Sequence, residues 1–137
     1  MSQSEYEVML ITDDSRSKAL VAAAAASAKK ADDIKILEVG PLIFITDYFV
    51  ICSGNNERQV KTIADEVMRK MLAHGLKPYR REGEKEQRWV LLDYLDIVVH
   101  IFHWEEREFY GIERLWADAD TVALEEEPNA AHLASLR

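Results

Sequence analysis

The stretch RWVLLDYLDIVVHIFHWEER, residues 88–107, constrains the fold more than any other part of this chain. It contains two aliphatic runs on either side of a short acidic segment, which is the pattern of a β-hairpin. A two-residue loop at Tyr94–Leu95 would place alternate residues of both runs on one face. The expected cross-strand pairs on that face are Trp89 with His100, Leu91 with Val98, and Asp93 with Asp96.

The two faces of this predicted hairpin differ in chemistry. One face is uniformly aliphatic and must meet helices; its residues are Val90, Leu92, Ile97, Val99 and Ile101. The face of Trp89 mixes aromatic, aliphatic, acidic and imidazole side chains, as a surface for a partner does. A further helix could instead cover this face, with Trp89 in the core and His100 hydrogen-bonded beneath it. The hairpin pattern alone leaves both interpretations open.

The other segments predict one domain of mixed α and β structure. Helices are expected at 15–31, from Asn56 to Gly75, and around 109–116, and strands at 33–40, 47–54 and 77–83. The order α-β-β-α-β-β-β-α favours a single α/β (α+β) domain with a mixed five-stranded sheet flanked by helices. We expect an N-terminal extension at 1–14, the domain at 15–120, and a C-terminal tail at 121–137 that frays.

Composition agrees with this interpretation. The 137 residues fit a single domain, and 48% hydrophobic with 31% charged residues is typical of a globular protein. Cys52 is the only cysteine, so a reducing compartment is expected. No signal peptide is visible, and the longest apolar runs are too short to cross a bilayer. These features predict a soluble, cytoplasmic protein with no membrane partner.

The net charge of −8 limits the possible partners. Phosphate binding depends on lysine and arginine, so we expect little direct contact with nucleic acid. The charge is also uneven, because residues 104–127 contain nine acidic residues and only Arg107 and Arg114 as basic ones. This region suits a basic protein partner, although each acidic residue could equally belong to a solvated surface.

Histidine and cysteine give little support for a metal or a nucleophile. His100 and His103 should lie on opposite faces of a strand, and no segment has the spacing of a structural zinc site. We therefore predict no metal site. Cys52 could act as a nucleophile beside His100, but a cysteine inside a strand is usually an inert apolar residue.

Two further patterns could carry chemistry. In the segment CSGNNERQV, residues 52–60, small polar residues precede the N-terminus of a predicted helix, where an anion could bind. The alternative interpretation of this segment is a strand-to-helix turn with an N-cap. Asp93 and Asp96 could hold Mg²⁺ for nucleotidyl transfer, or they could serve only the turn.

Three blocks of the sequence resemble the ribosomal silencing factor family, also called Iojap-like proteins. They are TDYFVICSGNNERQVKTIADEV, REGEKEQRWVLLDYLDIVVHIF and REFYGIERLWADA, in this order along the chain. The resemblance runs from about residue 15 to about residue 120. It implies a fold similar to nucleotidyltransferases, without their catalytic acidic motif and without known enzymatic activity. We expect no cofactor.

The resemblance also implies a partner. Family members bind a large-subunit ribosomal protein, the fourteenth in the usual count, and thereby block association with the small subunit and damp translation. The tryptophan of the family's hairpin, which is Trp89 here, lies at that contact. The chain departs from the family at the turn, where Leu95 replaces a residue that is usually glycine; leucine disfavours positive φ.

These observations lead to a prediction of a binding protein that represses translation by steric exclusion. Trp89 should be the main contact, Leu91 and Val98 should add apolar contact, and the polar contacts should come from Asp93, Asp96 and His100. One alternative is a nucleotidyltransferase-like enzyme that uses the two aspartates with Mg²⁺. Another alternative is a homodimerisation module, because an open sheet face can pack against the same face of a second copy. The free protein could therefore form a homodimer.

Overall fold

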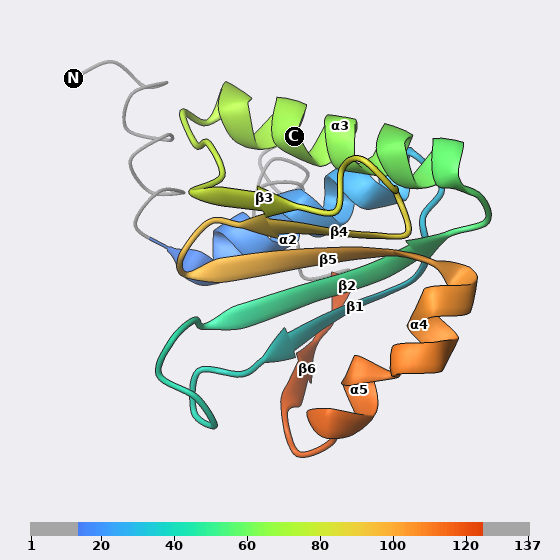
Figure 1. Cartoon of the computed structure of the whole chain (residues 1–137). Coiled ribbons are helices and arrows are strands. Elements are labelled where there is room, and N and C mark those ends of the chain that lie inside the picture. The colour runs from blue at the N-terminus through green and yellow to red at the C-terminus, as the bar shows by residue number, and fades with distance from the viewer. Residues whose placement is uncertain (1–13, 125–137) are drawn as a thin grey trace, which may run out of the picture.

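Strands β2 (Tyr48–Gly54) and β5 (Ile97–His103) lie side by side at the centre of a six-stranded sheet (Figure 1). The computed structural model describes residues 14–124. The strand order is β3-β4-β5-β2-β1-β6, in which β2 and β5 are parallel and the other neighbouring strands are antiparallel. The remaining strands are β1 (Asp32–Glu38), β3 (Arg80–Glu82), β4 (Trp89–Asp93) and β6 (Asp120–Val122), of which β3 and β6 are the edge strands. The mixed sheet confirms the predicted fold class.

Helices α2 (Ser15–Ala28) and α3 (Glu57–Ala73) cover one face of the sheet. The predicted periodicity of α3 is confirmed, and its buried apolar residues are Val60, Ile63, Ala64, Val67 and Met71. α2 is buried largely through alanines, whose small side chains let its backbone pack close to α3 and to the sheet. The aliphatic face of the hairpin packs into the same core, which confirms that helices cover it.

The hairpin of β4 and β5 forms, but its turn lies one residue later than predicted. The loop is Leu95–Asp96, closed by a 2.9 Å hydrogen bond from Tyr94 N to Ile97 O. The observed partners on the Trp89 face are Trp89 with Phe102, Leu91 with His100, and Asp93 with Val98. Each partner is displaced by two residues, so the predicted pairs are wrong. Because side chains alternate with a period of two, nearly all residues keep their predicted face.

Leu95 adopts φ 75° in this turn, where Asp96 N donates a 3.0 Å hydrogen bond to Tyr94 O. This is a three-residue γ-turn, a conformation that is strained for a leucine. The carboxylate of Asp93 supports the turn, because its Oδ1 accepts a 2.8 Å hydrogen bond from Leu95 N. The side chain of Asp93 and the neighbouring strands therefore hold Leu95 in a backbone region that favours glycine.

Two short helices and one short strand complete the fold. α4 (Trp104–Tyr110) and α5 (Ile112–Leu115) replace the single helix predicted around 109–116 and are separated by Gly111 at φ 51°. β6 makes the sheet six-stranded rather than five-stranded, and it pairs with β1 at Ile36–Glu38. Three residues are too few to show alternation, which is why β6 was not predicted.

The segments predicted at the two ends of the chain fall mostly outside the described residues. Of the extension at 1–14, the structure describes Asp14, whose side chain caps α2 by accepting a 3.0 Å hydrogen bond from Arg16 N. Of the tail at 121–137, it describes 121–124, which include the end of β6. Within residues 14–124, no helix is both long enough and apolar enough to span a membrane.

Candidate docking face

The sheet face opposite α2 and α3 carries most of the predicted site residues. Alternation along β4 and β5 places these side chains there: Trp89, Leu91, Asp93, Val98 and His100. Phe49 of β2 lies on the same face and packs edge-on against the His100 ring, with ring centroids 4.8 Å apart. α4 and α5 lie at one end of this face, and no other helix of residues 14–124 covers β4 and β5 on this side (Figure 1). We call this surface the docking face.

Trp89 lies at the centre of an aromatic cluster on the docking face. Its ring stacks on Phe102 at a centroid distance of 4.7 Å and contacts Tyr110 of α4 at 5.0 Å. The indole Nε1–H donates a 3.2 Å hydrogen bond to Nδ1 of His100. Trp89 remains half-buried while Phe102 beneath it is fully buried. The indole is therefore held by three neighbouring rings while part of its surface stays accessible.

His100 is buried behind Trp89, with 5% of its surface exposed. Because Nδ1 accepts the hydrogen bond from Trp89, the neutral ring must carry its proton on Nε2. Burial lowers the pKa of His100 to about 4, so the ring is neutral at physiological pH. Nε2 is buried and has no hydrogen-bond partner among the described residues. In this structure His100 orients Trp89 and does not itself form the surface.

The two aspartates of the turn face different sides of the sheet. Asp93 stays on the docking face, where its Oδ2 lies 3.7 Å from Nη2 of Arg80. Asp96 points toward α2, and its Oδ2 forms a 2.6 Å ion pair with Nζ of Lys18, which is itself buried. The prediction that Asp96 shares the Trp89 face is therefore wrong. Residue 96 lies in the turn, and a lysine 78 positions away determines the direction of its side chain.

This geometry removes the support for the enzymatic alternatives. Asp93 and Asp96 do not converge, so they offer no common site for Mg²⁺. Cys52 packs in the core beneath the helices, on the face opposite His100, and burial raises the pKa of its thiol to about 12. A thiol with such a pKa is not a nucleophile at neutral pH. Among residues 14–124, no three histidine, cysteine or acidic side chains cluster as metal ligands would.

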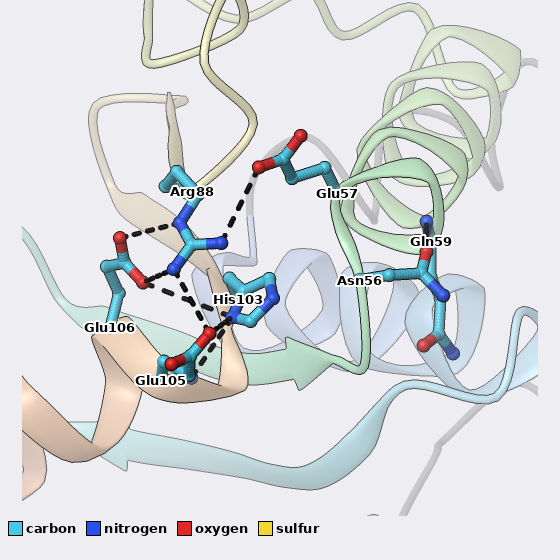
Figure 2. A network of polar contacts seen from close by, with 7 residues as sticks. All are labelled: Asn56, Glu57, Gln59, Arg88, His103, Glu105 and Glu106. Atoms are coloured by element: carbon cyan, nitrogen blue, oxygen red, sulfur yellow. Dashed lines mark hydrogen bonds and ion pairs between the residues drawn. The ribbon is translucent and has the colours of Figure 1, made fainter.

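The start of α3 is an N-capped turn rather than an open anion site (Figure 2). Asn56 Oδ1 accepts a 2.8 Å hydrogen bond from Gln59 N, and Gln59 Oε1 accepts one of 2.7 Å from Asn55 N. The amide Nε2 of Gln59 donates to Lys30 O at 3.0 Å, which ties the turn to the end of α2. The predicted alternative of a capped turn therefore accounts for the segment at 52–60.

Arg88, immediately before β4, links the start of α4 to the start of α3 (Figure 2). Its guanidinium binds Glu106 through two hydrogen bonds of 2.7 and 2.6 Å and lies 3.4 Å from Glu105 Oε1 and 3.5 Å from Glu57 Oε1. The bidentate pair lowers the pKa of Glu106 and raises that of Arg88. Much of the negative charge that the sequence places beside the hairpin is therefore paired within the protein.

A second arginine, Arg107, anchors α4 and α5 to the sheet. It is buried, and its Nε donates a 2.9 Å hydrogen bond to Glu113 Oε1. Its Nη1 donates to Asp32 O at 3.1 Å and to Ser53 Oγ at 3.3 Å. These bonds connect α4 with α5, β1 and β2, and so hold Tyr110 in place beside Trp89.

Sequence reasoning missed several residues of this site: Phe49, Arg88, Phe102, Arg107 and Tyr110. The alternation in residues 47–54 places Phe49 and Ile51 on one face, but only the parallel pairing of β2 with β5 shows which face that is. The partners of the arginines come from distant segments, and no local pattern in the sequence identifies them.

Fold and site together define a class of protein. It is a small α+β domain in which two helices cover one sheet face, while the other face carries an aromatic cluster around Trp89. The sequence profile of the family described as "Ribosomal silencing factor during starvation" matches residues 12–135. The chain belongs to this family, which confirms the resemblance seen in the sequence blocks.

Individual relatives agree with this assignment. The chain is 43% identical over 105 residues to "Ribosomal silencing factor RsfS" of Bacillus subtilis, covering 77% of this chain and 89% of the relative. It is 37% identical over 93 residues to the mouse protein "Mitochondrial assembly of ribosomal large subunit protein 1", covering 64% of this chain and 40% of that protein. Maize "Protein Iojap, chloroplastic" is 35% identical over 105 residues, covering 74% and 44%.

Solved structures confirm the architecture. A crystal structure from Chromobacterium violaceum superposes with a TM-score of 0.74 at 31% identity, covering 76% of this chain and 87% of that one. A crystal structure from Bacillus halodurans has a TM-score of 0.67 at 40% identity, covering 75% and 93%.

Proposed function

We propose that this protein represses translation by binding the large ribosomal subunit and sterically blocking the small subunit. The contact would be a ribosomal protein at the subunit interface, the fourteenth in the usual count. Steric exclusion requires no catalysis and no cofactor. The proposed location is the cytoplasm, where the subunits meet.

The aromatic cluster around Trp89 is the observation that carries this proposal. A half-buried tryptophan held in one orientation by neighbouring rings and a hydrogen bond is typical of a binding hot spot. Leu91 and Val98 are half-buried on the same face and offer apolar contact, and Asp93 adds a charge at the rim. His100 fixes the orientation of the indole, so the partner meets a preorganised surface.

A homodimer of the free protein remains a second proposal. The same half-buried aromatic face could meet a second copy across a two-fold axis. Sedimentation of the free chain and of Trp89→Ala would test it. A dimer that dissociates in the variant supports a shared face, and a wild-type monomer at all concentrations contradicts it.

Replacement of Trp89 by alanine tests the proposed contact with the large subunit. We expect binding to isolated large subunits to weaken by about 2 kcal/mol, or roughly thirtyfold, as for hot-spot tryptophans. Because Trp89 is half-buried, the loss of folding stability should stay below the ~3–5 kcal/mol of a core tryptophan. Binding should be measured on folded protein, verified by circular dichroism.

Trp104→Ala provides a control for the loss of a surface tryptophan, because Trp104 is 48% exposed and stacks on His103 at the start of α4. It should bind as wild type does. Normal binding by folded Trp89→Ala would exclude the docking face as the contact. A variant that melts far below the wild type would instead show that Trp89 is mainly a core residue.

A further inference from the structure

The loop between β1 and β2, residues 40–47, exposes the most accessible apolar side chains of the described chain. Phe44 is 99% exposed, Ile45 is 87% exposed and Leu42 is 47% exposed. No charged residue lies between Gly40 and Thr46. An exposed apolar cluster of this kind marks a binding surface more often than a scattered single residue does.

This loop is held in place rather than left free. Val39 N and Gly40 N both donate to Asp47 O, at 2.9 and 3.0 Å, and close the base of the loop. Leu42 N and Ile43 N both donate to Val39 O at 2.9 Å and form a tight turn. Phe44 and Ile45 are therefore presented by an ordered backbone, which reduces the entropy lost when a partner binds.

The loop continues the docking face at its end away from α4 and α5. Ile43 packs into the same apolar cluster as Phe49 and Trp89. The loop also touches the hairpin turn, because Asp47 N donates a 2.9 Å hydrogen bond to Asp96 O. Figure 1 shows the loop and the hairpin turn at one end of the strands, and α4 and α5 at the other.

We propose that Phe44 and Ile45 form a second contact with the protein that binds the docking face, against an apolar patch of that partner. This inference rests on the proposed function. Continuity with the docking face favours one partner for both, because Ile43 of the loop packs in the cluster of Trp89 and the loop is hydrogen-bonded to the hairpin turn. The segment from Gly40 to Thr46 carries no charged side chain, so its contribution is burial of apolar surface rather than steering.

The double variant Phe44→Ser/Ile45→Ser tests this proposal. We expect the Kd for isolated large subunits to rise at least tenfold, while the melting temperature stays near that of the wild type because both side chains are exposed. Weakening by loss of apolar contact should persist at high salt, unlike the loss of a charge contact. Leu72→Ser serves as the control, since Leu72 is 53% exposed on α3, on the opposite layer. It should leave binding unchanged.

Comparison with Trp89→Ala separates the possible failures. If Trp89→Ala loses binding and the loop variant does not, the loop proposal is wrong and the docking face stands. If neither variant loses binding, the proposed function fails as well. If the wild type is a dimer that the loop variant converts to a monomer with unchanged subunit binding, the loop contacts a second copy, and the proposal is overturned.

Discussion

The two faces of the sheet differ in burial and in chemistry, although neighbouring residues of the same strands form them. On β5, Val99 is fully buried beneath α2 and α3, while Val98 next to it is half-buried on the docking face. The helix-covered face is uniformly aliphatic, whereas the docking face combines aromatic rings, a histidine and a carboxylate. Stability and recognition are thus assigned to alternate residues of the same strands, so single substitutions should separate them.

His100 is the exception on the docking face, because it is a polar residue that is buried. Its pKa of about 4 lies below the ordinary value of 6.5, so the unfolded chain binds a proton that the folded chain does not. The free energy of unfolding should therefore be independent of His100 above pH 6.5. It should fall as the pH drops from 6.5 toward 4, by about 3 kcal/mol in total. Urea unfolding at several pH values measures this loss.

His100→Gln isolates this contribution, since glutamine can accept the hydrogen bond of Trp89 without titrating. The variant should show a flatter dependence of stability on pH than the wild type. Equal slopes for both proteins would mean that His100 titrates normally and is not buried behind Trp89.

Val99→Ala and Val98→Ala compare the two faces directly. Val99→Ala removes two methyl groups from a fully buried site and should lower the free energy of unfolding by about 2 kcal/mol, with little effect on subunit binding. Val98→Ala should lower it by less than about 1 kcal/mol but should weaken binding. Chemical denaturation and a binding titration on both variants test this, and the reverse pattern would exchange the roles of the faces.

Asp96→Asn and Asp93→Asn extend the comparison to charge. Asp96→Asn leaves the ammonium of buried Lys18 without its ion pair, so we expect a loss of about 2 kcal/mol of stability. Asp93→Asn should change stability by less than about 0.5 kcal/mol. It should instead slow association with large subunits at low salt, with the difference shrinking at high salt. Stopped-flow rates that are identical for wild type and Asp93→Asn would remove Asp93 from the contact.

Leu95→Gly tests the turn that joins the two strands. Glycine adopts φ 75° without strain, and Leu95 is mostly exposed, so little apolar contact is lost. The gain in stability should be about 0.5–1 kcal/mol, after the greater flexibility of glycine in the unfolded chain is included. A lower melting temperature in the variant would show that the Leu95 side chain stabilises the turn.

Local pattern predicted much of this architecture, and long-range contacts account for the rest. The amphipathic period of α3 and the alternation in β4 and β5 identified the core face and the face of Trp89. The turn was predicted one residue too early because the segment between the two strands contains no glycine or asparagine to fix the turn type, and Leu95 adopts a positive φ that is disfavoured for leucine. The direction of Asp96 depends on Lys18, and the anchoring of α4 depends on Arg107 meeting Asp32, which no spacing rule reveals.

The parallel pairing of β2 and β5 has a consequence for how the chain folds. The central strands join residues 48–54 to residues 97–103, with α3, β3 and β4 between them in sequence. Such non-local pairing slows folding, because a long loop must close before the contact forms. During synthesis, the first half of the chain emerges with β2 unpaired on the side where β5 will lie, and its apolar surface stays open until residue 103 follows. A chain interrupted before β5 should therefore aggregate or require a chaperone.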